Sequence, residues 1–144
     1  MMQDYQEIKI LLVEDDDIDA KAVTRGFKKL KLLNPIIRAT NGQEALDILN
    51  GKGGETTIIK PYIVLLDLNM PIMGGLEFLS HIRDDEKLQD AIIFVLTTSQ
   101  ADSDRVSAYK KHIAGYILKS NVGDGFKNVI DLIDQFWRVV LLPK

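Results

Sequence analysis

Five short apolar runs, each followed by a segment with helical periodicity, constrain the fold of this chain more than any other feature. The runs are rich in β-branched residues, which is typical of strands buried on both faces. We place the strands at residues 8–13, 36–40, 62–66, 91–96 and 115–118. We expect helices at residues 18–32, after residue 42, and at 75–84, 101–112 and 123–141. This alternation predicts an α/β fold with a five-stranded parallel sheet, doubly wound by helices on both faces.

The first predicted helix follows an acidic cluster at residues 14–17. Either Asp16 or Asp17 can cap it, because a carboxylate accepts hydrogen bonds from the free N–H groups of a helix start. Asp19 is favourable in the first turn for the same electrostatic reason. The expected contacts with the core are Ile18, Ala22, Phe27 and either Leu30 or Leu33.

Composition narrows the class of protein. The chain has 144 residues, of which 46% are hydrophobic and 27% charged, as in an ordinary globular protein of one domain. A net charge of -3 argues against non-specific binding of nucleic acid, and the lack of cysteine excludes disulfides and thiolate chemistry. We expect no signal peptide at residues 1–7, and the chain has no apolar stretch of the ~20 residues that a membrane helix requires. We therefore expect a cytoplasmic protein without nucleic-acid or membrane partners.

Polar residues stand at the ends of four predicted strands. The apolar run at residues 62–66 ends in Asp67 and is followed by a loop rich in turn formers. Glu14 and Asp15 end the first strand, Thr97 the fourth and Lys119 the fifth. The carboxyl ends of neighbouring parallel strands meet in one crevice at the point where the strand order reverses. We therefore expect these five side chains to lie close together.

Three carboxylates at one place repel each other unless a cation joins them, and hard oxygen ligands suit Mg²⁺. With this metal, the parts of a phosphoryl-transfer site are present. Asp67 would attack phosphorus, Lys119 would hold a phosphoryl oxygen as a point charge, and the Thr97 hydroxyl would donate a hydrogen bond to another. The backbone carbonyl of Asn69 could complete the metal shell.

Each of these residues also has a simpler interpretation. An acidic cluster is most often a solvated helix start, and an Asp at a strand end can serve as a helix cap. The functional interpretation is favoured because four separate strands place chemically compatible groups at the same edge of the sheet. His81 and His112 do not follow a predicted strand, and we assign them to the surface or to packing.

These residues, with the motif Asp67-Leu68-Asn69-Met70-Pro71 and its continuation to Gly75, resemble the signature of two-component response-regulator receiver domains. The resemblance implies a flavodoxin-like (CheY-like) fold in which Asp67 accepts a phosphoryl group from a histidine kinase or a phosphotransfer histidine. It implies Mg²⁺ at Glu14, Asp15, Asp67 and the Asn69 carbonyl. It also implies a conformational switch formed by Thr97 and Tyr116. Such a domain catalyses its own phosphorylation and dephosphorylation and is not an enzyme for a separate substrate.

The chain departs from the common receiver pattern at two positions. Glu14 stands where an Asp is commoner, which lengthens one metal-binding arm. Ser120 follows Lys119 where many receivers have a proline, often with a cis peptide bond. A cis X-Pro bond cannot form here, so the geometry of this loop is not predicted by the resemblance.

A narrower resemblance is to the single-domain regulators associated with bacterial phytochromes. It is carried by Thr97-Thr98-Ser99, by residues 109–113 and 116–120, by the loop at 51–60, and by the ending from Phe136-Trp137 to Leu142-Pro143. It implies that the phosphoryl donor is a light-regulated histidine kinase.

The last predicted helix carries more apolar residues than one core-facing stripe requires. We expect a homodimer through this helix, with contributions from the fifth strand and the fourth helix, and we name polar replacements of Trp137 and Phe136 as its test. The receiver domain takes up nearly all of residues 1–144, so we expect no output domain and a signal carried by protein contacts.

Two alternatives from other classes remain open. A phosphohydrolase of the haloacid-dehalogenase kind also uses a strand-end Asp and Mg²⁺, but it needs an acid where this chain has Asn69. A pseudo-receiver would keep the fold as a binding module and never carry phosphate. The presence of all the acids of the site, together with Thr97 and Lys119, argues against a pseudo-receiver.

Overall fold

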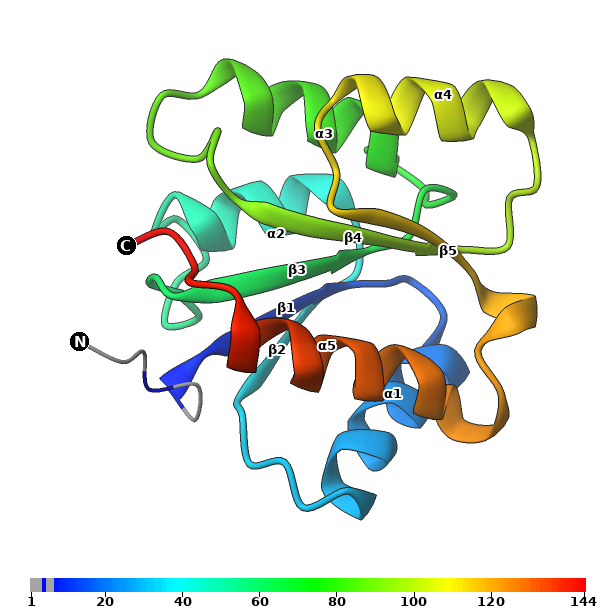
Figure 1. Cartoon of the computed structure of the whole chain (residues 1–144). Helices are drawn as coiled ribbons and strands as arrows, with labels where there is room; N and C mark the ends of the chain where they lie inside the picture. Colours follow the sequence, from blue (N-terminus) through cyan, green and yellow to red (C-terminus); the bar gives the residue numbers. More distant parts are fainter. Residues whose placement is uncertain (1–3, 5–6) are drawn as a thin grey trace.

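The computed structural model describes residue 4 and residues 7–144, which form a central sheet with helices on both faces (Figure 1). The strands are β1 (Lys9–Val13), β2 (Ile36–Ala39), β3 (Tyr62–Leu66), β4 (Ile92–Thr97) and β5 (Gly115–Leu118). The α-helices are α1 (Asp17–Lys29), α2 (Gly42–Leu49), α3 (Gly75–Asp84), α4 (Asp102–Lys110) and α5 (Lys127–Val139). Two short 3₁₀ helices, η2 (Lys119–Asn121) and η3 (Asp124–Phe126), join β5 to α5. The predicted doubly wound α/β fold is confirmed.

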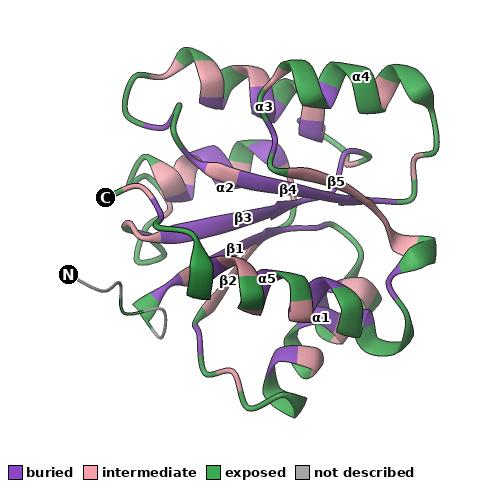
Figure 2. Cartoon of the chain, viewed as in Figure 1, coloured by how far each residue is buried: buried purple, intermediate pink, exposed green. Residues whose placement is uncertain are grey.

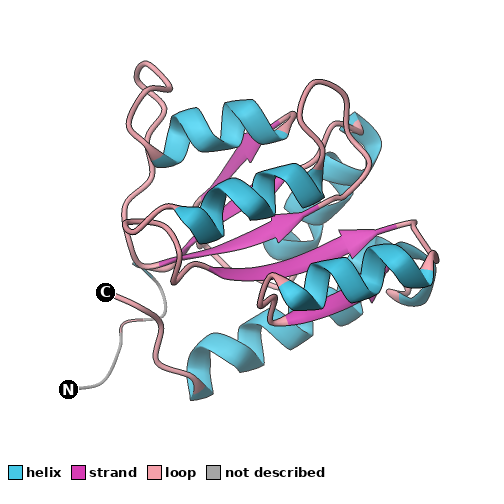
Figure 3. Ribbon diagram, turned by 90° about the horizontal axis from the view of Figure 1, so that it is seen from above, coloured by secondary structure: helices cyan, strands magenta, loops and turns pink. Residues whose placement is uncertain are grey.

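The sheet is parallel throughout, with the strand order β2-β1-β3-β4-β5. Viewed from above, its arrows point in one direction (Figure 3). The order reverses between β1 and β3, where Val13 pairs with Leu66. A crevice beyond the carboxyl ends of these two strands is the usual ligand site of such a sheet. The residues that follow Val13 and Leu66 therefore occupy its edge.

Two hydrophobic cores fill the space between the sheet and its helices. Helices α2, α3 and α4 cover one face, and α1 and α5 cover the other (Figure 1). Successive residues of β1 alternate between the two cores, Leu11 facing the first and Leu12 the second. All five residues of β3 are buried, as the purple central strand in Figure 2 shows. Because β3 is buried on both faces, its end is a rigid support for the residue that follows.

Helix α1 buries a different stripe from the one we predicted. Asp16 caps the helix, since its carboxylate accepts hydrogen bonds from the N–H groups of Ile18 and Asp19. Ile18 is 79% exposed in the first turn, and Leu33, beyond the helix end, is 91% exposed. Leu30 is exposed as well, so among the predicted contacts only Phe27 is buried and Ala22 half-buried. The buried stripe has a spacing of three and four residues and consists of Ala20, Val23 and Phe27.

The last helix is shorter than predicted at both ends. Gly123 and Gly125 have positive φ values of 71° and 62°. A right-handed α-helix requires negative φ values, so the helix cannot begin at residue 123. The helix begins at Lys127, and its buried stripe is Val129, Ile130, Ile133 and Trp137. Trp137 is 1% exposed and packs against Phe27 with ring centroids 6.2 Å apart. The Trp137 ring therefore belongs to the core of the single chain, so replacing it cannot test a dimer surface.

Within the described part of the chain, no helix combines the length and the apolar character needed to cross a bilayer.

Candidate functional site

Glu14 and Asp67 lie side by side at the carboxyl edge of the sheet. Each follows the last residue of its strand, and the Asp67 N–H donates a hydrogen bond to the carbonyl oxygen of Val13, at 3.0 Å. The Glu14 N–H donates to the Ala39 carbonyl oxygen at 2.9 Å, which ties the acidic turn to β2 as well. Hydrogen bonds between backbone groups therefore hold both residues at this edge independently of their side-chain contacts.

Glu14, Asp15 and Asp67 bring a carboxylate oxygen each to within 4.8 Å of one another. Glu14 is 3% and Asp67 7% exposed, whereas Asp15 is exposed. Burial and the charge of Asp67 raise the pKa of Glu14 from 4.5 to about 7, against the lowering effect of Lys119. The cluster thus holds more negative charge than its surroundings solvate well, which is a condition that a divalent cation relieves.

Lys119 lies among these acids at the end of β5. Its ammonium nitrogen is 2.6 Å from Glu14 Oε1, 2.7 Å from Asp19 Oδ2 and 3.4 Å from Asp67 Oδ2. Burial alone would lower the pKa of Lys119, but hydrogen bonds to Asp19 and Glu14 raise it above its usual value. The group is therefore a fixed positive charge at every pH at which the protein works.

Thr97 ends β4 and is fully buried. Its Oγ1 accepts a hydrogen bond from the Ser99 N–H at 3.3 Å, and within the described part of the chain its hydroxyl makes no hydrogen bond to the three acids. Tyr116 of β5 is half-buried, and its hydroxyl donates to the Ser99 carbonyl oxygen at 2.9 Å. Thr97 and Tyr116 thus meet at the same loop residue, Ser99.

The loop after Asp67 is shaped by close backbone approach. The Asn69 N–H donates to Asp67 Oδ1 at 3.4 Å, and the Asn69 side chain is exposed. The Gly75 N–H donates to the Leu68 carbonyl oxygen at 2.9 Å, and a Cβ at this position would lie 2.5 Å from the Asp67 carbonyl oxygen. Only glycine allows α3 to start so close to the end of β3.

The position after Lys119, where many receivers have proline, forms the short helix η2. Among the described residues, the single cis peptide bond is Lys60–Pro61, which lies at the opposite end of β3. The peptide bond between Lys119 and Ser120 is therefore trans, and Lys119 still reaches the acids.

A family comparison agrees with this geometry. The family model of the response regulator receiver domain matches residues 10–131. The chain belongs to this family. The receiver domain is 36% identical over 129 residues to FilR2, a probable methanogenesis regulatory protein of Methanothrix harundinacea (strain 6Ac), covering 89% of this chain and 82% of FilR2.

It is 35% identical over 136 residues to the response regulator Rcp1 of Synechocystis sp. (strain ATCC 27184 / PCC 6803 / Kazusa), covering 93% of this chain and 92% of Rcp1. The crystal structure of Mn²⁺-bound Rcp1 has a TM-score of 0.83 and 31% identity, with 96% of this chain and 99% of that chain covered. The phosphorylated cyanobacterial phytochrome response regulator RcpA has a TM-score of 0.85 and 29% identity, with the same coverage. The receiver domain is thus related to phytochrome response regulators.

Two residues at the site were not predicted. Asp19 appeared in the sequence as a helix-start acid, and the structure adds its contact with Lys119. Arg38 of β2 donates from Nε to the Glu14 carbonyl oxygen at 3.0 Å and from Nη1 to Asp17 Oδ1 at 2.7 Å. The contacts of Arg38 could have been predicted from the sequence, because an arginine near the end of an edge strand lies beside the acidic turn.

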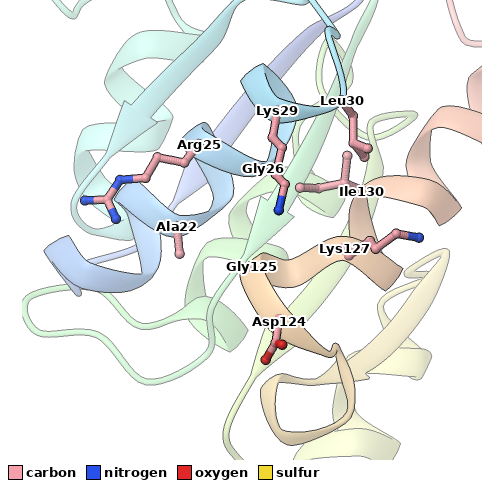
Figure 4. Close-up of a pocket in the computed structure, with 9 residues that line it drawn as sticks. All are labelled: Ala22, Arg25, Gly26, Lys29, Leu30, Asp124, Gly125, Lys127 and Ile130. Atoms are coloured by element: carbon pink, nitrogen blue, oxygen red, sulfur yellow. The ribbon is translucent and has the colours of Figure 1, made fainter.

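A cavity of about 340 Å³ lies elsewhere, between α1 and the segment η3–α5. Figure 4 shows Ile130 of α5 reaching toward Gly26 of α1, while Arg25 and Lys127 extend in opposite directions. A Cβ on Gly26 would meet the Ile130 side chain and lie 2.7 Å from the Gly125 carbonyl oxygen. None of the acids at the sheet edge lines this cavity, so it is separate from the site.

Proposed function

We propose that this receiver domain is a single-domain response regulator that accepts a phosphoryl group on Asp67. The observation that carries the proposal is the setting of Asp67, which is almost buried, with Lys119 3.4 Å away and two further carboxylates beside it. Burial makes the electrostatic contacts of this carboxylate strong, while the exposed Asp15 leaves one side of the cluster open. The donor is a histidine kinase or a phosphotransfer protein.

In the proposed transfer, an Oδ atom of Asp67 forms a bond to phosphorus as the bond between phosphorus and the donor's imidazole nitrogen breaks. The electron pair of that bond stays on the imidazole nitrogen. Lys119 holds a phosphoryl oxygen as a point charge. Thr97 Oγ1 accepts from the Ser99 N–H, so its own proton is available for a second phosphoryl oxygen. Later hydrolysis of the aspartyl phosphate by the domain itself would return it to its starting form.

The residues present fit Mg²⁺, which receiver domains bind at an acidic site. Glu14, Asp15, Asp67 and the backbone carbonyl of Asn69 would hold it, and the cluster of three acid oxygens together with Mn²⁺-bound Rcp1 supports this assignment. When bound, the metal supplies positive charge against the charge that develops on the phosphoryl oxygens. Without it, Lys119 is the one cation within 4 Å of these acids in the described part of the chain.

The proposed donor is a phytochrome-type histidine kinase. The likeness to Rcp1 and RcpA across nearly the whole chain supports this choice, and so do the local strings around Tyr116 and the C-terminus. Identity to FilR2 is equally high, so the donor needs its own test. A phytochrome-type kinase that carries a labelled phosphoryl group on its histidine should transfer this group to the receiver within seconds to minutes of mixing. A chemotaxis-type kinase serves as the control donor.

The output is proposed to be a protein contact, with a homodimer formed through α5 and β5. Thr97 and Tyr116 would change the surface next to β5 when Asp67 carries phosphate. The cytoplasmic location and the lack of nucleic-acid and membrane partners stay predictions from the sequence.

The function is tested with acetyl phosphate and Mg²⁺, followed by a phosphate-affinity gel and intact-mass measurement. We expect a mobility shift and one added phosphoryl group for the native chain, and none for Asp67→Asn. Labelling should also stop in EDTA. A native chain that takes no label would favour a pseudo-receiver, and repeated turnover of an aryl phosphate would favour a phosphohydrolase.

A further inference from the structure

Asp19 contacts Lys119 almost as closely as Glu14 does, and more closely than Asp67 does. The distance from Lys119 Nζ to Asp19 Oδ2 is 2.7 Å, against 3.4 Å to Asp67 Oδ2. Asp19 is held in place because its own N–H donates to the capping carboxylate of Asp16 at 3.2 Å. The geometry of the helix start thus aims this carboxylate at the ammonium group.

Lys119 has two other partners, and the proposed metal needs both of them. Glu14 and Asp67 belong to the cluster of three acid oxygens, while Asp19 lies outside it. The Lys119 side chain is 9% exposed, so repulsion between its charge and a divalent cation would be weakly screened. A lysine held by Glu14 and Asp67 alone would compete with the cation for the same oxygens. Asp19 gives the ammonium a partner that the cation does not use.

We propose that Asp19 is a positioning residue that anchors the Lys119 ammonium beside the acids, so that Glu14 and Asp67 are free to bind a divalent cation. This inference rests on the proposed function. Asp19 touches no reacting atom, and it acts through the lysine, which remains close enough to meet a phosphoryl oxygen on Asp67.

The alternative role of Asp19 is to stabilise the start of α1 with its charge. Asp17 provides a matched control, because it stands in the same first turn and carries the same charge. Its side chain is 74% exposed and pairs with Arg38 at 2.7 Å instead of with Lys119. Asp17→Asn therefore removes one negative charge from the helix start without touching the lysine.

The experiment measures the Kd for Mg²⁺ by calorimetry in Asp19→Asn, Asp17→Asn and Asp19→Glu. Without the Asp19 carboxylate, Mg²⁺ should bind more weakly, and we expect the Kd of Asp19→Asn to be about fivefold higher than the Kd of Asp17→Asn. This factor corresponds to an ordinary interaction energy between two residues in contact. Asp19→Glu keeps the carboxylate and should return the Kd to within about twofold of native. An Asp19→Asn variant that matches Asp17→Asn would overturn the role.

A second measurement repeats both Asn substitutions in a Lys119→Met background. If Asp19 acts through the lysine, the two substitutions then change the Kd by the same amount, because no ammonium is left to anchor. An Asp19→Asn effect of equal size with and without Lys119 would show a through-space charge effect and contradict the proposal. Should Lys119→Met fail to fold, the rescue by Asp19→Glu decides.

The two proposals fail in different ways. If acetyl phosphate does not label the native chain, the proposed function is wrong. If the native chain is labelled and binds Mg²⁺, but Asp19→Asn and Asp17→Asn share one Kd, only the role of Asp19 is wrong.

Discussion

The phenolic hydroxyl of Tyr116 is bonded to the backbone of Ser99, donating to its carbonyl oxygen at 2.9 Å. The N–H of Ser99 donates to Thr97 Oγ1 at 3.3 Å. The two residues of the predicted switch are therefore linked through one loop residue, although they stand on different strands. A movement of the Thr97 hydroxyl toward a phosphoryl group would disturb the backbone that holds the tyrosine.

Tyr116→Phe tests this link. The change removes the hydrogen bond to Ser99, and we expect the free energy of unfolding to fall by about 1 kcal/mol, the usual net value of such a bond. Labelling of Asp67 by acetyl phosphate should be unchanged, because Tyr116 contacts none of the acids. Urea unfolding and the phosphate-affinity gel give the two values. Tyr109→Phe, which loses a bond from the Tyr116 N–H at 3.2 Å, is the control. Loss of labelling in Tyr116→Phe alone would contradict this division of roles.

Glu14→Gln should stabilise the metal-free protein at high pH. The pKa of Glu14 is about 7 in the fold and 4.5 when the group is free, so the fold binds its proton more tightly than the unfolded chain does. Stability contributed by this group is therefore lost as the pH rises from about 4.5 through 7. At pH 8 in EDTA, we expect the variant to exceed the native chain by about 1–2 kcal/mol in free energy of unfolding. At pH 5 the difference should nearly vanish.

Magnesium should reverse the order of these two proteins at pH 8. A ligand that binds only the folded state stabilises it in proportion to the logarithm of its concentration above Kd. The native chain should gain stability as Mg²⁺ is added, and Glu14→Gln should gain less because one acid ligand is missing. A Glu14→Gln variant that is less stable than native at pH 8 in EDTA would show that its ion pair with Lys119 outweighs the burial of its charge.

Gly75→Ala should displace Asp67. The added Cβ would lie 2.5 Å from the Asp67 carbonyl oxygen and 2.7 Å from Leu68 Cα, both of which are backbone atoms. We expect a loss of about 2 kcal/mol in stability, as for other overpacked sites, and slower labelling of Asp67. Gly54→Ala is the control, since its φ of 68° is strained but its Cβ would enter open space. A loss in Gly75→Ala that is no larger than the loss in Gly54→Ala, with labelling of Asp67 unchanged, would contradict this role of the close approach.

The site residues at strand ends could be predicted because a parallel sheet leaves little freedom there. Once residues 62–66 are a buried strand, Asp67 must lie at the edge beside the residue that follows β1. The contact between Asp19 and Lys119 could not be predicted in this way. It depends on the direction in which α1 leaves the acidic turn and on the length of the lysine side chain, and neither is encoded in local periodicity.

The helix faces were predicted less well than the strands. Helix α1 offers more apolar residues than its buried stripe uses, so periodicity alone allowed Ile18 as a core contact when the cap at Asp16 turns it to solvent. In the last helix, by contrast, a residue of the core was not recognised as buried. We named Trp137 for the test of the dimer because the sequence does not reveal that Phe27 of α1 faces it.

The burial of Trp137 changes how the predicted homodimer must be tested. Replacing this residue by a polar one would remove a core side chain and cost about 3–5 kcal/mol, so the variant would unfold before it reported on association. Phe136 is also engaged within the chain, edge-on to Phe94 with centroids 5.2 Å apart. Val139 and Leu141 remain as accessible apolar residues at the same end, 79% and 73% exposed.

The double variant Val139→Ser, Leu141→Ser should separate the predicted dimer without unfolding the chain. Both side chains are solvated in the single chain, so the free energy of unfolding should change by less than about 1 kcal/mol. If the end of α5 forms the interface, light scattering after gel filtration should give twice the mass of one chain for native protein and a single chain for the variant. Leu33→Ser is the control, because Leu33 is 91% exposed and lies outside α5, beyond the C-terminal end of α1. A native protein with the mass of one chain, before and after labelling of Asp67, would contradict the predicted homodimer.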